Sequence, residues 1–102
     1  MKVMVMFDLP TINPSHRLAY VRFRKRLFQL GFEPFQESVY VKECDTQWDV
    51  KMITRVIGNI VPAEGKVTTC NFSDRQWAET RHYEDGEKIE RRDESRQVVM
   101  IL

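Results

Sequence analysis

One acidic residue stands where an apolar strand ends. Residues 3–7, Val-Met-Val-Met-Phe, form a continuous apolar run, and Asp8 follows directly, ahead of a Pro turn. A carboxylate in this place can cap the turn by bonding to nearby backbone amides. It can also bind Mg²⁺, which takes hard oxygen ligands, often one or two carboxylates with water and phosphate oxygens. Two-fold symmetry would bring two such carboxylates together, and a shared Mg²⁺ would then activate a water and bind a phosphodiester.

A second candidate is a basic run in the segment that follows. Five basic side chains and no acid occupy residues 17–26, namely Arg17, Arg22, Arg24, Lys25 and Arg26. On a helical wheel Arg17 and Arg24 flank one side of an apolar stripe, Arg22 and Arg26 flank the other, and Lys25 points away. Such residues can simply border a buried face with their charges in water. A solvated helix usually mixes signs, so an unpaired basic surface favours contacts with nucleic-acid phosphates.

Other residues that could do chemistry have simpler explanations. His16 lies in the first helical turn and could be a general base, but a lone His at a helix start is usually incidental. Gln36, Ser38 and Tyr40 could bond to a substrate, yet the pattern of a strand explains them. The sequence has no glycine-rich phosphate loop, nucleophile elbow or HExxH metal motif.

The hydrophobic pattern predicts the elements that position Asp8 and the basic run. The apolar run at 3–7 is typical of a central strand buried on both faces, and Pro10 ends it. Asn13 or Ser15 can cap a helix that spans residues 15–30. The apolar stripe of this helix consists of Tyr20, Phe23, Leu27 and Leu30.

The hydrophobic pattern predicts further strands and helices after residue 31. Val39 and Val41 alternate with other residue types, which gives their strand one apolar face. Thr46 and Asp49 have capping-box spacing and begin a second helix, which Pro62 ends. The remaining predicted elements are strands at 32–36, 38–43 and 66–72 and a short helix that begins after Ser73.

This order, β-α-β-β-α-β, predicts an α/β (α+β) ferredoxin-like sandwich with two helices on one face of an antiparallel sheet. We expect this core over residues 1–78. Residues 79–102 are expected to form a charged linker, a loop or hairpin with a turn at Asp85-Gly86, and an extra C-terminal strand. An uncovered sheet face and an apolar tail at 97–102 favour a homodimer.

Composition limits the class of protein. The 102 residues have 42% hydrophobic and 30% charged side chains, which is typical of one globular domain. The formal net charge of +1 hides an asymmetry, because residues 1–30 hold six basic side chains against one acid. Cys44 and Cys70 are too few for a disulfide scaffold and form no CxxC pair. We expect a soluble cytoplasmic protein with no membrane span and no zinc site.

Three stretches of the sequence are similar to a known family. They are residues 6–11 (Met-Phe-Asp-Leu-Pro-Thr), residues 20–27 (Tyr-Val-Arg-Phe-Arg-Lys-Arg-Leu), and Gly31-Phe32 with Gln36-Glu37-Ser38-Val39-Tyr40-Val41. Together they resemble the second CRISPR-associated (Cas) protein family, a small adaptation subunit often called an endoribonuclease. The likeness is greatest to members from type II systems. It extends more weakly through residues 73–78, 86–88 and 93–99, and so covers nearly the whole chain.

The resemblance implies a ferredoxin-like homodimer in which each C-terminal strand packs on the other protomer's sheet. The dimer interface would then include Val98, Val99, Met100 and Ile101. It implies a heterohexamer in which one dimer of this protein bridges two dimers of the adaptation integrase and holds protospacer DNA for insertion into the CRISPR array. The family's metal-binding Asp ends the first strand, and Asp8 matches it. The arginines match the family's DNA-backbone surface in character, with Arg22, Arg24 and Arg26 as the foremost candidates.

The function expected from these residues is therefore that of a spacer-acquisition subunit with Mg²⁺-dependent endonuclease activity on single-stranded RNA or duplex DNA. Asp8 is the candidate catalytic residue. A single carboxylate per subunit with no evident second base is a lean catalytic site. One alternative is a stand-alone, toxin-like ribonuclease. Another is a non-catalytic RNA-binding module, which the lack of an RNP-like aromatic pair in the strands disfavours.

Overall fold

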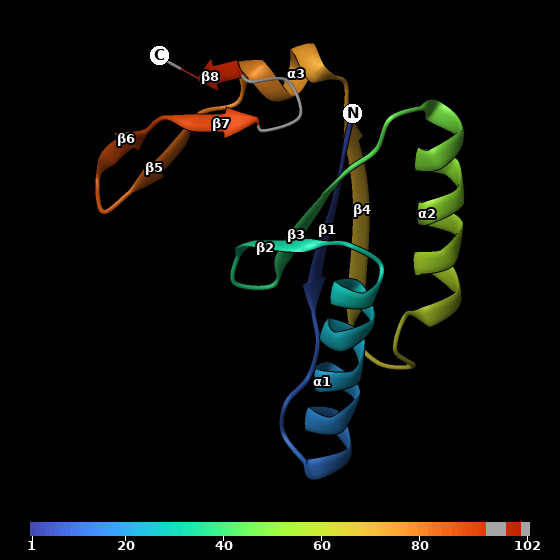
Figure 1. The fold of residues 1–102 in the computed structure, drawn as a ribbon. Coiled ribbons are helices and arrows are strands. Elements are labelled where there is room, and N and C mark those ends of the chain that lie inside the picture. Colours follow the sequence, from blue (N-terminus) through green and yellow to red (C-terminus); the bar gives the residue numbers. More distant parts are fainter. Residues whose placement is uncertain (94–97, 101–102) are drawn as a thin grey trace.

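The computed structural model describes the backbone of residues 1–93 and 98–100 and the side chains of residues 1–90. Four strands form one antiparallel sheet in the order β2-β3-β1-β4. Helices α1 and α2 run beside this sheet (Figure 1). The elements of this core are β1 (Lys2–Asp8), α1 (Pro14–Gln29), β2 (Glu33–Gln36), β3 (Val39–Glu43), α2 (Gln47–Ile60) and β4 (Lys66–Phe72). The order confirms the ferredoxin-like sandwich predicted from the sequence.

Strand β1 is central, as predicted, but only one of its faces is fully buried. Val3, Val5 and Phe7 point into the core, and each is at most 7% exposed. Met4 and Met6 alternate with them and are half-buried on the opposite face. The alternation arises because successive side chains of a strand point to opposite sides. Both helices pack on the Val3 side, so neither helix covers the Met side, which is called the uncovered face. Only the end of this face at Lys2 and Phe72 is covered, by Trp77.

Helix α1 begins at the Asn13 cap, whose side chain accepts a hydrogen bond from the backbone N–H of His16. Of the two predicted caps, Asn13 is therefore the one that is used. Phe23 and Leu27 of the predicted stripe are buried, and Tyr20 and Leu30 pack against the core. Gly31 follows with φ +93°, the left-handed conformation common just beyond a helix end.

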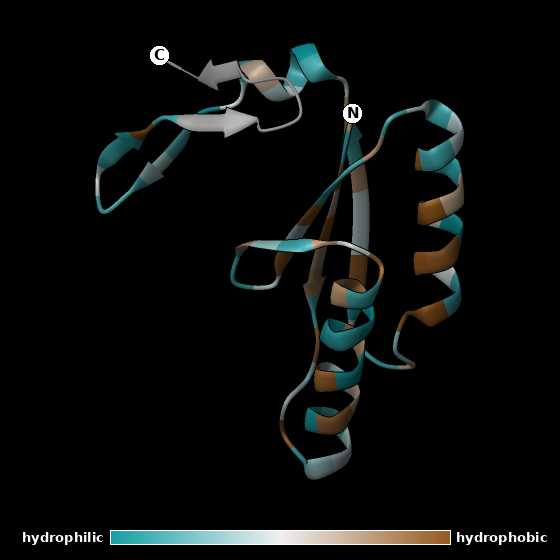
Figure 2. Cartoon of the chain, in the orientation of Figure 1, coloured by the Kyte–Doolittle hydropathy of each residue, from teal (hydrophilic) through white to brown (hydrophobic). Residues whose placement is uncertain are grey.

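The second helix begins as the sequence predicted. Thr46 and Asp49 form the complete capping box, each side chain accepting from the other's backbone N–H. Val50 and Ile57 are buried. Figure 2 shows the hydrophobic residues of α2 on the side of the helix that faces the sheet. Within the described residues, no helix has the length and apolar character needed to cross a membrane.

In strand β3 the apolar face predicted from Val39 and Val41 is not the face that enters the core. Its apolar Val39 and Val41 are only half-buried, on the same uncovered face as Met4 and Met6. Tyr40 is the residue that enters the core, 5% exposed, with its ring stacked on Phe7 at 5.7 Å between centroids. The core side of β3 is thus occupied by Tyr40, whose aromatic ring fills core volume as an aliphatic side chain would. Val39 and Val41 lie on the other side of the strand.

The C-terminal part extends from the end of the sheet where β1 begins (Figure 1). It consists of α3 (Asp74–Glu79), β5 (His82–Glu84), β6 (Glu87–Ile89), β7 (Arg91–Asp93) and β8 (Val98–Met100). The turn at Asp85-Gly86 joins β5 and β6 in an antiparallel hairpin, with positive φ at both residues. Strand β8 pairs with β7, Asp93 opposite Val98. Ile101, which the sequence placed in a dimer interface, lies outside the described residues.

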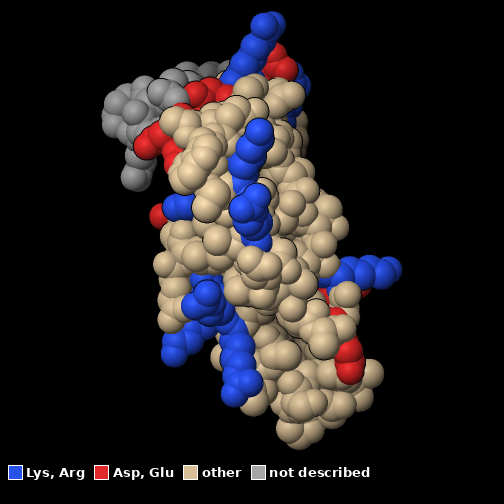
Figure 3. Space-filling model, turned by 90° about the vertical axis from the view of Figure 1, so that its right-hand side faces the viewer, with Lys and Arg blue, Asp and Glu red and all other residues tan. Residues whose placement is uncertain are grey.

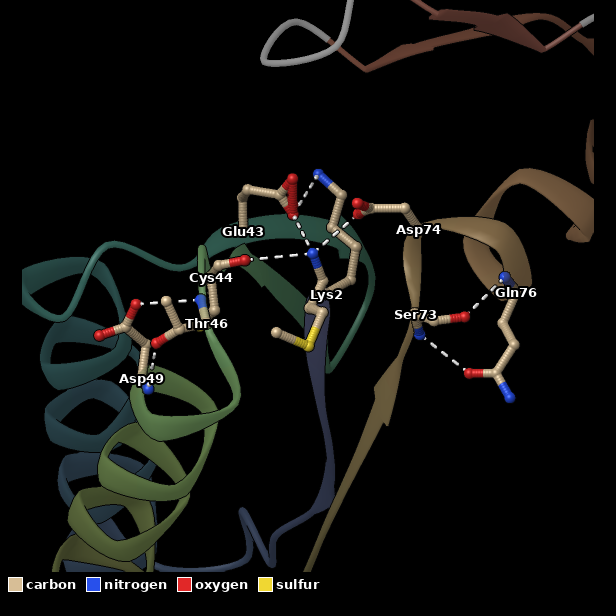
Figure 4. A network of polar contacts seen from close by, with 9 residues as sticks. Lys2, Glu43, Cys44, Thr46, Asp49, Ser73, Asp74 and Gln76 are labelled. Atoms are coloured by element: carbon tan, nitrogen blue, oxygen red, sulfur yellow. Dashed lines mark hydrogen bonds and ion pairs between the residues drawn. The ribbon is translucent and has the colours of Figure 1, made fainter.

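A polar network ties the start of β1 to α3 (Figure 4). The Met1 ammonium donates to Asp74 Oδ1 at 2.8 Å, to the Cys44 carbonyl at 3.1 Å and to Glu43 Oε2 at 3.3 Å. Burial lowers the pKa of this ammonium, but the hydrogen bonds and charges of Asp74 and Glu43 outweigh it, so the pKa is raised above 8.0. The network lies at the opposite end of β1 from Asp8.

Candidate functional site

Asp8 is the last residue of β1, and its side chain is exposed. In the β1–β4 ladder it lies directly opposite Lys66. Side chains in such a pair share one face of the sheet, with Cβ atoms about 5 Å apart. Within the described residues the Asp8 carboxylate makes no ion pair, so it remains available to a ligand. Lys66 is not among the residues predicted from the sequence, because its place opposite Asp8 depends on the register of two strands far apart in the chain.

The backbone of Asp8 is held in place by the loop between α2 and β4. Gly65 has φ +96° and packs against this backbone. A β-carbon at position 65 would lie 2.7 Å from the Asp8 carbonyl oxygen and 2.8 Å from Leu9 Cδ2. Only glycine permits both this conformation and this approach. The loop therefore fixes where β1 ends and where the carboxylate of Asp8 emerges.

The β2–β3 turn borders the site on its other side. The backbone N–H of Phe7 donates to the Ser38 carbonyl at 3.0 Å, next to Asp8 in the chain. Ser38 itself has φ +59°, a conformation that is uncommon for a residue other than glycine. Strained residues of this kind cluster at functional sites, where the surrounding structure holds them. The turn is thereby anchored beside the end of β1.

A pocket of about 330 Å³ opens between this turn and α1. Arg24 lies over the ring of Tyr20, with its guanidinium carbon 5.7 Å from the ring centroid. The pocket is lined by Tyr20, Arg24, Pro34, Phe35, Gln36, Glu37, Ser38 and Tyr40. Gln36, Ser38 and Tyr40 had been explained from the sequence as strand residues only. The structure brings all three to one pocket with a basic side chain of α1.

Arg17 lies on the same side of α1 as Arg24 but has a different role. Its guanidinium donates to the carbonyl oxygens of Thr11 and Ile12, both at 3.3 Å. These carbonyls belong to the loop that connects Asp8 to α1. Arg17 therefore secures that loop, and its charge is partly used within the chain.

Arg22 and Arg26 lie on the other side of α1, as the helical wheel predicted. Together with Ala19, Phe23, Ile60 and Pro62 they line a groove of about 200 Å³ between α1 and the end of α2. Both arginines are exposed, and α1 contains no acid that could pair with them. Figure 3 shows Lys and Arg side chains grouped at the lower left of the face it displays, with no acidic side chain among them. The basic run is thus divided between two flanks of one helix.

His16 is already engaged in a structural contact. Its Nε2 atom meets the carboxylate of Glu64, which joins the start of α1 to the α2–β4 loop. Its Nδ1 atom is buried without a hydrogen-bond partner. The pair ties α1 to the loop that holds Asp8. His16 therefore has a structural role in this loop and is not a free general base.

The environment of each cysteine disfavours its thiolate. Burial raises the pKa of the Cys44 thiol and of the Cys70 thiol above the usual value, which disfavours the reactive thiolate. Both are free cysteines. Cys44 belongs to the hydrophobic core, and Cys70 is half-buried in β4.

The residues near Asp8 fit a Mg²⁺ site in which the protein supplies few of the ligands. In the part of the chain that is described, no group of three or more His, Cys, Asp or Glu side chains could hold a metal ion. The exposed carboxylate of Asp8 therefore belongs to no such group. Mg²⁺ is commonly bound through one or two carboxylates, with waters and substrate phosphates completing its octahedron. The residues present fit a site in which water supplies most of the ligands. The described residues do not form a site in which three or more His, Cys, Asp or Glu side chains bind the metal ion.

Comparison with known proteins bears directly on this arrangement. The family model described as "CRISPR associated protein Cas2" matches residues 1–80. A protein of Parvibaculum lavamentivorans is 40% identical over 83 residues, covering 81% of this chain and 82% of its own. A protein of Lacticaseibacillus rhamnosus is 34% identical over 101 residues, covering 99% of this chain and 100% of its own. Both relatives carry the name "CRISPR-associated endoribonuclease Cas2". The matched region contains β1 with Asp8, the basic helix and the β2–β3 turn, and the chain belongs to the Cas2 family of CRISPR-associated proteins.

Proposed function

We propose that this protein is a CRISPR adaptation subunit that binds nucleic-acid backbone along α1 and hydrolyses phosphodiester bonds at Asp8. The observation that carries the proposal is the exposed carboxylate of Asp8 at the end of the central strand, which has no ion-pair partner among the described side chains and has Lys66 opposite it in the ladder. A carboxylate such as that of Asp8 can hold the metal ion that metal-assisted phosphodiester hydrolysis uses. The relatives' name, endoribonuclease, supports the same reaction class.

Each residue has a distinct part in the proposed reaction. Asp8 would hold Mg²⁺, and when bound the metal ion supplies Lewis-acid chemistry to the phosphate and a more acidic water. The Lys66 ammonium faces the same edge of the sheet and donates to phosphate oxygens, where negative charge grows in the transition state. Arg22 and Arg26 bind neighbouring phosphates, because they are exposed and have no acid beside them on the helix.

The proposal includes a homodimer in the cytoplasm that bridges two integrase dimers and holds protospacer DNA. The sheet face that neither α1 nor α2 covers supports the dimer. Trp77 packs on only one end of it, and the apolar residues Met4, Met6, Val39 and Val41 remain half-buried there. An isologous contact there would pair equivalent surfaces of two copies. Val98, Val99 and Met100 of β8 remain candidates for the same interface. Free Cys44 and Cys70 suit a reducing compartment.

The test is Asp8→Asn, which keeps the size of the side chain and removes its charge. Cleavage of RNA and DNA that depends on added Mg²⁺ should be lost, whereas binding of the same oligonucleotides should persist. Asp85→Asn is the matched control, because Asp85 is an exposed Asp in the β5–β6 turn and should leave cleavage unchanged. Full Mg²⁺-dependent cleavage by the Asp8 variant would exclude Asp8 from the reaction. Sedimentation of the untreated protein as a single chain would exclude the dimer.

A further inference from the structure

We infer that the pocket between α1 and the β2–β3 turn binds one unstacked nucleobase of a single-stranded substrate. This inference rests on the proposed function, because it assumes that the substrate backbone runs along α1. At about 330 Å³ the pocket reaches the size range of small-molecule sites, roughly 300–1,000 Å³. Its position follows from the Phe7–Ser38 hydrogen bond, which places the turn beside the end of β1. A strand bound along α1 therefore passes this pocket, whereas Asp8 alternates with Phe7 and projects from the other face of the sheet at the same end of β1.

The walls of the pocket suit the face of a base. The Arg24 guanidinium lies over the ring of Tyr20 on α1, and Arg24 is an exposed residue. Unpaired bases stack on aromatic rings and on arginine planes in proteins that bind single strands. Tyr20 is itself braced by the Phe7 ring, 5.9 Å away in an edge-to-face contact. The stacking surface is therefore held by the core rather than by a loop.

The polar residues of the pocket suit the edge of a base better than a phosphate. Glu37 lines the pocket and would repel a phosphate, but a carboxylate accepts hydrogen bonds from the amino groups of bases. Gln36 adds a side-chain amide that both donates and accepts. A purely electrostatic phosphate site would have no use for Glu37. The mixture of one cation, one anion and an amide around an aromatic wall points to a nucleobase.

A base can enter the pocket only if it leaves its stack. Duplex substrates would have to unpair and flip a nucleotide at a free-energy cost, whereas single strands offer unpaired bases directly. A single strand can therefore fill the pocket, and an intact duplex leaves it empty. Duplex DNA would still bind through its phosphates along α1, without using the pocket.

The test removes bases from the substrate and leaves the protein's fold untouched. Short single-stranded RNAs, each with an abasic nucleotide at a different position, are titrated against the full-length protein without divalent metal. Loss of the base that enters the pocket should weaken binding about 5- to 150-fold, the range found for one stacked base. Abasic sites elsewhere, and abasic sites in duplex DNA, should have much smaller effects. Equal binding of every abasic RNA would overturn the inference.

Two matched variants link the effect to this pocket. Arg24→Gln and Arg26→Gln each remove one exposed positive charge from α1, but only Arg24 lines the pocket. Both should weaken binding to RNA and to duplex DNA, while only Arg24→Gln should remove the sensitivity to the abasic position. If both variants keep that sensitivity, the base lies elsewhere and the inference is wrong. Persistent Mg²⁺-dependent cleavage with no abasic effect would refute the pocket and leave the proposed function standing, whereas absence of cleavage would refute the proposed function.

Discussion

The Gly65 α-carbon lies so close to Asp8 that a β-carbon added there would sit 2.7 Å from the Asp8 carbonyl oxygen. The contact joins the loop after α2 to the last residue of the central strand. The candidate catalytic carboxylate is therefore positioned by a residue that has no side chain.

Gly65→Ala should destabilise the protein and displace the end of β1. The left-handed conformation alone costs a residue with a β-carbon about 1–2 kcal/mol, and the collision with Asp8 adds to this. Urea unfolding would measure the loss, and Mg²⁺-dependent cleavage should fall with it. Gly58→Ala is the control, since a β-carbon there meets nothing within 4 Å and Ala is favoured over Gly in a helix by about 1 kcal/mol. A Gly65→Ala protein as stable and active as the parent would show that the contact is unimportant.

Ser38→Val should lower the free energy of unfolding by about 1–2 kcal/mol, because a β-branched side chain resists the left-handed conformation that Ser38 adopts. Ser38→Asn should be nearly neutral, since Asn tolerates this conformation. The two variants differ in backbone preference while both lose the hydroxyl. Thermal unfolding of both would separate the contributions, and equal melting temperatures would argue against strain at the turn.

Neutralising Arg22 and Arg26 together should reduce the salt dependence of DNA binding. Each lost phosphate contact lowers the slope of log K against log salt by about 0.9 for duplex DNA. The double change Arg22→Gln/Arg26→Gln removes exposed charges that line a shallow groove, so folding should be preserved. Binding titrations over a range of salt concentrations would give the slope. An unchanged slope would mean that this flank of α1 does not contact phosphates.

Stability should depend on pH through the Met1 ammonium. Its pKa in the folded chain is raised above 8.0, so its contribution is fully present below pH 8.0 and is lost as pH rises through the folded pKa. The midpoint of urea unfolding should therefore fall on the alkaline side. The double variant Glu43→Gln/Asp74→Asn lacks the charged partners, and its midpoint should fall less over the same interval. Parallel pH profiles for the two proteins would assign the loss to other groups.

Local sequence signals predicted most of the fold. The capping box at Thr46 and Asp49 and the positive-φ turn at Asp85 each depend on a few adjacent residues, and both appear where expected. The face of β3 was less predictable, since burial of Tyr40 depends on Phe7 and Phe28, which are distant in sequence. The periodicity of hydrophobic residues within one strand does not predict such contacts.

The candidate site was predicted only in part for the same reason. Asp8 could be singled out because it directly ends an apolar run, and the wheel separated Arg24 from Arg22 and Arg26. Lys66 could not be placed without the register of two strands far apart in the chain. The pocket likewise needs the β2–β3 turn to meet α1, which no spacing of residues in the sequence reveals.

The central position of β1 leaves Asp8 between two connections, the turn at Ser38 and the loop at Gly65. Sequence drift or a one-residue insertion in either connection would shift the carboxylate without replacing it. Members of a family built on this plan could therefore keep the same acid yet lose or retune cleavage through neighbouring loops alone.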